Sequence, residues 1–268
     1  MTELLGYLRA TARLLLLPLV TVPLVSILLI GTLLRAVWPR AGWPMFRWAI
    51  RTWARGILWV MGVRVEVDGS APSPPFFLVS NHLSYLDIPV LHSQLSGHFL
   101  SKAEIASWPI AGWLARIAGT LFVDRTRRRD LARVIPEVET LLRAGNGVVI
   151  FPEGTSSSGA EVLPFKPSLF EVPLRTGVAV SQAAIQYRLP DDSPTVAETV
   201  CWWGEMPFAS HFLKLLTLPG VDARVSFGAA PLVDDDRKRL SDRARQAVLQ
   251  QFRPTSPLPP ATNPAALC

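Results

Sequence analysis

The chain has 268 residues, of which 49% are hydrophobic, so it can build one catalytic domain and a membrane segment besides. Its net charge of +6 comes mostly from arginine, which favours anionic lipid headgroups and phosphorylated compounds as partners. No zinc-finger spacing, RNA-binding signature or continuous basic helix argues for nucleic acid, and with only two cysteines no disulfide framework or cysteine metal site is indicated.

Residues 1–62 are predicted to form a membrane anchor. Residues 14–34 are 21 uncharged residues, which as a helix would measure about 31 Å and match a hydrocarbon core of roughly 30 Å. Pro18 and Pro23 can kink such a helix, so the segment either spans the membrane or re-enters it as a hairpin. A cleaved signal peptide is the third interpretation. The apolar run is long for one, and no clear small-x-small cleavage site follows it.

The next segment, residues 43–61, combines tryptophans with arginines that recur every four residues. This pattern is typical of an amphipathic helix in the membrane interface, although a core helix with solvated arginines is the alternative. The excess of arginine after residue 34 places the following domain on the cytoplasmic side of the inner membrane. The residues concerned are Trp43, Trp48, Trp53 and Trp59, with Arg47, Arg51 and Arg55.

Residues 63–252 are predicted to form an α/β domain, and residues 253–268 a disordered proline-rich tail. The alternation of elements indicates a largely parallel sheet covered by helices, with ligands at the carboxyl ends of the strands. Strands are expected at 63–67, 76–79, 99–101, 120–123, 148–151, 178–187 and 223–227, and helices at 84–92, 109–118, 131–142, 210–218 and 237–252.

His82 follows the second of these strands, and Asp87 lies five residues later. On one straight helix this spacing would turn the two side chains about 140° apart, so they can meet only across a strand-loop-helix junction. Ser84 would cap the helix, and Asp87 in its first turn would reach back to the imidazole. The pair then suits a general base and the residue that orients it. A histidine that merely caps the helix is the alternative.

Two further strand ends carry polar residues. Residues 119–125 deliver Asp124 and Arg125 to the sheet edge, where Arg125 can clamp a phosphate. The arginines at 127–129 are interpreted as a solvated or lipid-facing patch. Residues 151–159 form a loop with one carboxylate, hydroxyls and glycine, which can bind a polyol or phosphate, although an ordinary turn is the alternative.

The segments Asn81-His82-Leu83-Ser84-Tyr85-Leu86-Asp87, 119–125 and 151–157 resemble, in this order, the motif blocks of the glycerolipid acyltransferase family. This family includes 1-acylglycerol-3-phosphate acyltransferases, and the resemblance covers roughly residues 43–186. It implies transfer of a fatty acyl group from acyl-coenzyme A or acyl carrier protein to a lysolipid hydroxyl at the bilayer. It also implies a hydrophobic groove for the acyl chain, with no cofactor and no metal.

The resemblance further implies a role for individual residues. His82 would be the general base that deprotonates the acceptor hydroxyl, with Asp87 as its orienter and Arg125 as a phosphate contact. Glu153, Gly154 and Thr155 would belong to the acceptor site, and Asn81, Lys102 and Ser156 are further candidates. The oxyanion donor stays open between Lys102 and the backbone amides after Phe151. Ser84 as a nucleophile is disfavoured because the Gly-x-Ser-x-Gly elbow is absent.

The acceptor stays open between two lysolipids. Phosphatidate-forming members usually carry arginine after the threonine of the third block, where this chain has Ser156. Residues 102–104, 108–109, 112–115 and 162–166 look more like the bacterial lyso-ornithine-lipid acyltransferase branch, which esterifies the 3-hydroxyl of an amide-linked fatty acid. The acceptor is therefore 1-acylglycerol-3-phosphate or lyso-ornithine lipid. A thioesterase or lysophospholipase that uses water, and a non-catalytic lipid-binding protein, are the alternatives from other classes.

Overall fold

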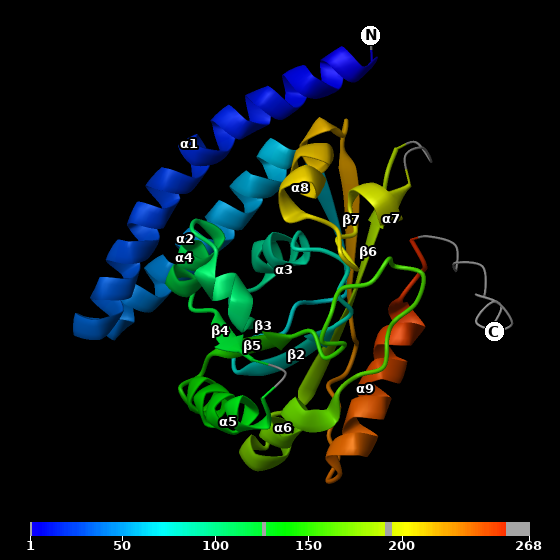
Figure 1. Ribbon diagram of the computed structural model, residues 1–268. Helices are drawn as coiled ribbons and strands as arrows, with labels where there is room; N and C mark the ends of the chain where they lie inside the picture. The colour runs from blue at the N-terminus through cyan, green and yellow to red at the C-terminus, as the bar shows by residue number, and fades with distance from the viewer. Residues whose placement is uncertain (1, 125–126, 191–194, 256–268) are drawn as a thin grey trace, which may run out of the picture.

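The computed structural model describes residues 2–124, 127–190 and 195–255, and its centre is a twisted seven-stranded sheet (Figure 1). The strand order is β1-β7-β6-β2-β5-β3-β4, in which β6 and β7 are antiparallel and every other neighbouring pair is parallel. The predicted, largely parallel sheet is therefore confirmed. The strands are β1 (Val63–Asp68), β2 (Phe76–Ser80), β3 (Gly97–Lys102), β4 (Leu121–Val123), β5 (Gly147–Ile150), β6 (Val180–Arg188) and β7 (Val221–Phe227).

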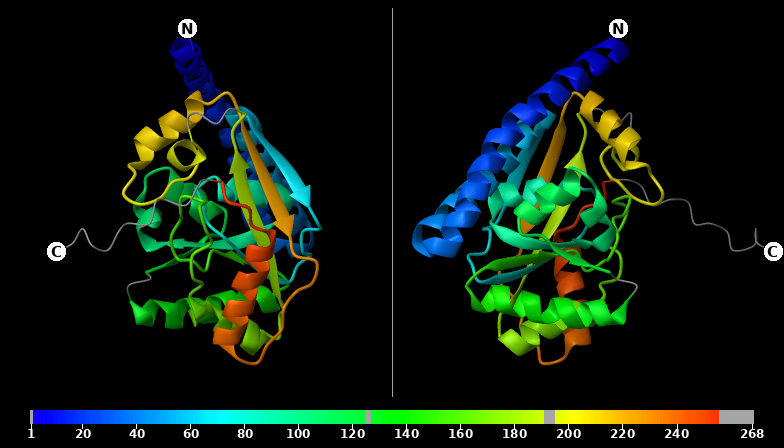
Figure 2. Two further views of the ribbon diagram at one scale, coloured as in Figure 1. Left: turned by 90° about the vertical axis from the view of Figure 1, so that its right-hand side faces the viewer. Right: turned by 60° about the vertical axis from the view of Figure 1, so that its left-hand side comes forward.

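Helices cover both faces of this sheet (Figure 2). One face packs against α2, α3 and α8, and the other against α5, α6 and α9, so each central strand is apolar on both sides. The helices are α1 (Thr2–Val37), α2 (Pro39–Met61), α3 (Asp87–Gln94), α4 (Ala111–Ile117), α5 (Arg128–Arg143), α6 (Glu171–Thr176), α7 (Val196–Thr199), α8 (Phe208–Thr217) and α9 (Arg237–Gln251), with 3-10 turns η1 (Ala103–Ser107) and η2 (Pro167–Phe170).

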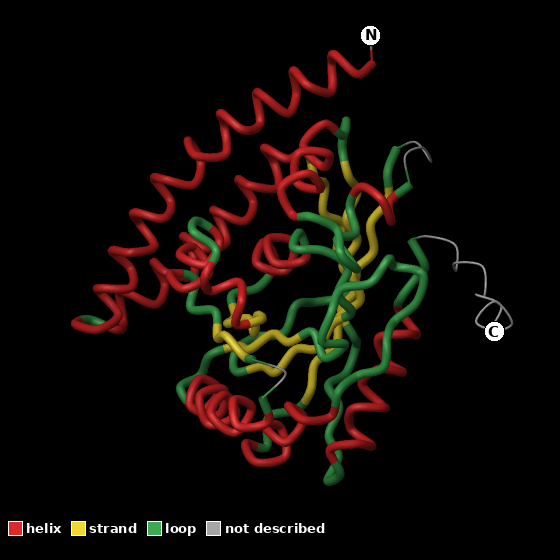
Figure 3. Tube along the Cα trace, viewed as in Figure 1, coloured by secondary structure: helices red, strands yellow, loops and turns green. Residues whose placement is uncertain are grey.

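The N-terminal segment is one continuous helix. α1 runs through Pro18 and Pro23, and the chain reverses at Trp38 so that α2 returns alongside α1 (Figure 3). The reversal thus lies after the apolar run, and no hairpin forms within residues 14–34. By length and composition the helix can cross a membrane: its most apolar window has a mean hydropathy of 2.6, and 17% of that window is buried.

Polar contacts fasten both N-terminal helices to the α/β domain. Arg13 of α1 donates to the carbonyls of Leu216 and Leu218, at 2.8 and 2.7 Å. In α2, Arg51 and Arg55 donate to the carbonyls of Gln94 and Ser93, at 2.6 and 3.2 Å.

Arg51 and Arg55 therefore contact the α/β domain, which neither the interfacial helix nor the core helix with solvated arginines predicted for them. The last carbonyls of a helix lack intrahelical partners, and these two cations satisfy those at the C-terminal end of α3. Trp48 and Trp59 do point outward, with 54% and 72% of their surface exposed.

The end of the described chain is attached to the domain. The amide of Thr255 donates to the carbonyl of Gly159 at 2.9 Å, so the first residues of the predicted tail pack beside the third motif. Residues 256–268 lie outside the described part of the chain, and the division into anchor, domain and tail stays a prediction.

Candidate active site

The topology brings the predicted site residues to one edge of the sheet. β6, β2, β5, β3 and β4 are neighbours and parallel, so their carboxyl ends lie in a row. In that row stand Tyr187, then Asn81 and His82, then Phe151 to Glu153, then Lys102, then Asp124. Arg125, the predicted phosphate contact, lies outside the described residues.

His82 and Asp87 meet across the loop between β2 and α3. His82 Nδ1 and Asp87 Oδ2 are 2.6 Å apart, and the same oxygen accepts the amides of Leu83 and Ser84 at 2.7 and 3.0 Å. Because the carboxylate oxygen of Asp87 accepts hydrogen bonds, the ring nitrogen that contacts it, Nδ1, carries the proton. The lone pair of Nε2 is then available to accept a proton. Nε2 has no hydrogen-bond partner among the described residues, and the side chain is 21% exposed.

Ser84 does not have the role expected of it. Its amide donates to Asp87, while its buried hydroxyl has no partner among the described residues and makes no bond to His82. The helix begins at Asp87 instead, because that carboxylate accepts two loop amides and is a stronger acceptor than a serine hydroxyl. The geometry does not support Ser84 as a nucleophile.

A third side chain, from the neighbouring strand β6, contacts Asp87. The hydroxyl of Tyr187, near the end of β6, donates to Asp87 Oδ1 at 2.6 Å, and both residues are fully buried. Burial and the adjacent Asp87 charge raise the pKa of Tyr187 well above its usual value, so the phenol keeps its proton. Sequence reasoning missed this residue, whose only signal is a hydroxyl near the end of a predicted strand that also contains Ser181, Gln182 and Gln186.

Glu153 holds the loop that carries His82. One carboxylate oxygen accepts the amide of His82 at 2.8 Å, and the other accepts the amide of Leu163 at 3.0 Å. Burial raises the pKa of Glu153 to about 8, against the lowering effect of these two donors. Phe151 stacks against the His82 ring with centroids 4.1 Å apart and planes 12° apart. Both residues therefore orient the histidine.

Asn81 extends the sheet beyond the end of β2. Its side-chain amide donates to the carbonyl of Ile185 at 2.9 Å and accepts the amide of Ile185 at 2.8 Å, as a strand neighbour would. The last backbone pair of these strands is Ser80 with Ala183. Asn81 thus sets the register of β6 against the loop that carries His82, and both ends of its side-chain amide bind the protein.

The remaining predicted site residues differ in whether their side chains face solvent or the protein interior. Thr155 is exposed, and Lys102 is exposed at the end of β3. Gly154 has a φ of +79°, and a β-carbon there would stand 2.8 Å from Lys166 Nζ, so this ammonium lies directly over the loop. Ser156 instead turns inward and donates to the carbonyl of Trp202.

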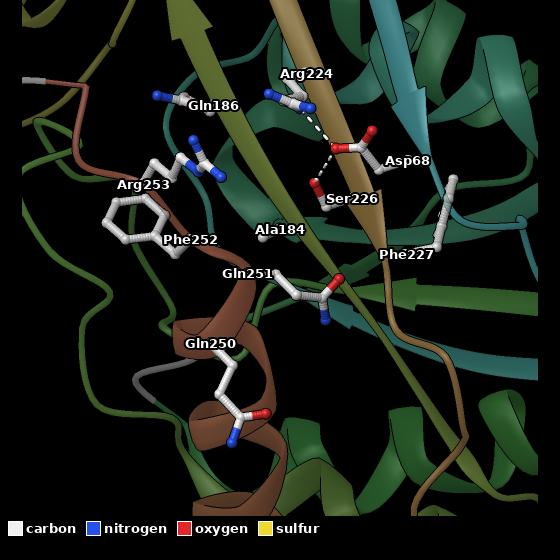
Figure 4. Close-up of a pocket in the computed structure, with 10 residues that line it drawn as sticks. All are labelled: Asp68, Ala184, Gln186, Arg224, Ser226, Phe227, Gln250, Gln251, Phe252 and Arg253. Carbon is white, nitrogen blue, oxygen red and sulfur yellow. Dashed lines mark hydrogen bonds and ion pairs between the residues drawn. The ribbon is translucent and has the colours of Figure 1, made fainter.

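A cleft of about 260 Å³ lies on the face of the sheet that α9 covers (Figure 4). Gln186 and Arg224 line it, and Arg224 is bound to Asp68 at 2.6 Å. Gln186 precedes Tyr187 in β6, and side chains alternate along a strand, so the two point to opposite faces. None of the predicted site residues lines this cleft.

The fold and this site are those of an acyltransferase. Residues 63–186 match the Acyltransferase family, and the chain belongs to that family. It is 36% identical to a lyso-ornithine lipid O-acyltransferase of Rhodobacter capsulatus, over 70% of each chain. It is 30% identical to a 1-acyl-sn-glycerol-3-phosphate acyltransferase of Neisseria meningitidis, over 72% of this chain and 76% of that one.

The fold is also known from a solved structure. The crystal structure of the 1-acyl-sn-glycerophosphate acyltransferase of Thermotoga maritima superposes with a TM-score of 0.68, covering 94% of this chain and 98% of that one. At 19% sequence identity this likeness shows the shared fold.

Proposed function

We propose that this protein transfers a fatty acyl group from an acyl thioester to the hydroxyl of a lysolipid, with His82 as general base. Nε2 takes the hydroxyl proton while the oxygen attacks the thioester carbonyl, and the imidazolium then protonates the departing thiolate. The observation that carries the proposal is that Asp87 and Glu153 hold the ring and the loop, so Nε2 is left for the acceptor. A base placed in this way accelerates transfer by about 10²- to 10⁴-fold.

The acceptor we propose is lyso-ornithine lipid. Ser156 stands where an arginine would hold a phosphate, and its hydroxyl is committed to the Trp202 carbonyl. The ornithine headgroup carries one carboxylate and one ammonium, so it needs fewer cations than a phosphate monoester. Lys166, whose Nζ lies beside Gly154, would meet that carboxylate. The similarity to lyso-ornithine lipid O-acyltransferases supports the same choice.

The second candidate acceptor is 1-acylglycerol-3-phosphate, with phosphatidate as product. Lys166 and Lys102 would serve a phosphate as well as a carboxylate, and the relatives include enzymes named for this substrate. Arg125 would add a phosphate contact.

We also propose that the enzyme works at the cytoplasmic face of the inner membrane. One side of α1 exposes a row of apolar side chains, among them Leu8, Leu15, Leu19 and Leu33, each more than half exposed. Such a surface is stable in hydrocarbon and unfavourable in water. It supports a position in which lysolipid reaches the site from the bilayer, while acyl-coenzyme A or acyl carrier protein arrives from the cytoplasm.

The test offers purified full-length protein a labelled acyl thioester with lyso-ornithine lipid, with 1-acylglycerol-3-phosphate, or with no acceptor. We expect faster ester formation on lyso-ornithine lipid, and a kcat at least about 10²-fold lower for His82→Ala. Thioester cleavage at full rate without lysolipid would instead identify a thioesterase. A clear preference for 1-acylglycerol-3-phosphate would overturn the acceptor assignment, and undiminished transfer by His82→Ala would overturn the mechanism.

A further inference from the structure

The carboxylate of Asp87 has partners on both of its oxygens. Oδ2 receives His82 Nδ1 and two loop amides, and Oδ1 receives the hydroxyl of Tyr187. Each carboxylate oxygen has about two acceptor positions, so the three donors on Oδ2 fill that oxygen, and the Tyr187 hydroxyl is the donor on Oδ1. Asp87 has no exposed surface, and each donor therefore affects how its charge is shared between the two oxygens.

The position of Tyr187 follows from the strand register. Asn81 pairs with both backbone groups of Ile185, and Tyr187 lies two residues farther along the same strand. Residues two apart share a face of a sheet, and Ala183, Ile185 and Tyr187 all pack in the core beneath α3. The same core holds Leu86, which directly precedes Asp87. The contact between strand and dyad is thus fixed by a buried, long-range pairing.

We propose that Tyr187 is a positioning residue that holds Asp87 in place and moderates the strength with which Asp87 stabilises protonated His82. A phenol that donates to Oδ1 draws negative charge toward that oxygen and away from Oδ2. Removing the phenol hydroxyl should therefore strengthen the interaction between Oδ2 and protonated His82. This inference rests on the proposed role of His82 as base.

Two other titratable groups, Cys201 and Glu153, face the dyad, and Tyr85 lies in the same loop with its hydroxyl toward His211. Cys201, in the loop after α7, interacts electrostatically with Asp87, and burial raises the pKa of its thiol to about 12. Tyr85 lies in the catalytic loop itself, and burial raises its pKa as well, so both groups stay neutral during an assay. Glu153, with a pKa raised to about 8, titrates in the assay range. A rate profile alone would therefore mix two groups, and the test must observe His82 directly.

The experiment compares full-length wild type with Tyr187→Phe in detergent micelles. It measures the pH profile of kcat/KM with acyl thioester and lyso-ornithine lipid, and the NMR titration of the histidine ring protons. The chain has four histidines, and the His82 signal is identified by its loss in His82→Ala. We expect Tyr187→Phe to move the acidic limb and the His82 titration midpoint together, by about half to one pH unit toward higher pH.

Tyr85→Phe is the matched control. Its hydroxyl lies in the same loop but contacts His211 Nδ1 at 3.0 Å, so both pH readouts should stay at their wild-type positions. If Tyr187→Phe lowers kcat but leaves both readouts unmoved, Tyr187 is merely structural and the proposal is overturned.

A second variant keeps the proposal testable if Tyr187→Phe does not fold. Site-specific replacement of Tyr187 by 3-fluorotyrosine keeps the hydroxyl and makes it a stronger donor. The His82 midpoint should then move to lower pH, opposite to the effect of phenylalanine, and an unchanged or higher midpoint would overturn the proposal. Full activity of His82→Ala would contradict the proposed role of His82 as base. If His82→Ala is inactive but the His82 midpoint does not move in the Tyr187 variants, only this inference is rejected.

Discussion

The loops that follow β2 and β5 lie side by side at the active edge but use their polar residues differently. In residues 81–87 the side chains of Asn81 and Asp87 are buried and hydrogen bonded within the protein. In residues 153–156, Glu153 turns inward, while Thr155 is exposed. The proposed base is thus positioned by the fold, whereas the groups proposed to meet the acceptor point outward. In this proposal, acceptor preference can change without disturbing the dyad.

The largest effect is expected from Asp87→Asn. This variant tests whether the loop at residues 81–87 requires the negative charge of Asp87 or only the shape of its side chain. The asparagine oxygen can accept at the Oδ2 position, while its NH₂ group faces Tyr187, whose hydroxyl can rotate to accept. The fold should survive, but the negative charge that stabilises imidazolium is lost. We expect kcat to fall about 10²- to 10³-fold with a melting temperature close to wild type. A kcat within threefold of wild type would show that shape is enough.

Glu153→Gln tests whether the second loop supports the first. An amide has one acceptor, so its NH₂ must face the amide of either His82 or Leu163 and leave that buried donor unpaired. We expect the free energy of unfolding at pH 6 to fall by about 1–3 kcal/mol, and kcat to fall about 10-fold. Glu161→Gln, an exposed change in the same loop, should alter neither quantity.

The pH dependence of stability sharpens the same test. The pKa of Glu153 is raised by folding to about 8, so the folded state binds its proton more tightly than the unfolded state. The resulting stability is fully present below the usual pKa of a glutamate, near 4.5, and is lost as pH rises through about 8. Denaturant unfolding between pH 5 and about 9 should therefore show a steeper decline for wild type than for Glu153→Gln. Parallel declines would mean that Glu153 does not titrate in this range.

The smallest effect is expected from Ser156→Arg. This change adds a cation to the loop at residues 153–156 and removes the hydrogen bond to the Trp202 carbonyl. The ratio of kcat/KM for 1-acylglycerol-3-phosphate to that for lyso-ornithine lipid should rise about 2- to 5-fold, the size of a solvent-exposed ion pair. Ser158→Arg places the same charge two residues away and is the control. An equal rise in both variants would mean that net charge, not position 156, decides the preference.

Local sequence patterns predicted most of the elements. Apolar runs marked β2 and β5, and the amphipathic pattern at 131–142 marked α5, because side-chain periodicity reflects which face is buried. The spacing of His82 and Asp87 predicted a strand-loop-helix junction, since no single helix could join them. Ser84 shows the limit of local reasoning. Serine is a common helix cap, but here the carboxylate of Asp87 accepts the loop amides.

By itself, the sequence determined the apolar N-terminal helix, the alternation of strands and helices, and the histidine and aspartate at one strand end. Only the tertiary structure decided that Tyr187 contacts Asp87, that Glu153 holds the amide of His82, and that Arg51 faces α3. Each of these contacts joins segments 43 to 100 residues apart, and each depends on sheet order, strand register or helix packing. Those properties arise from the whole core, and no local pattern of residues encodes them.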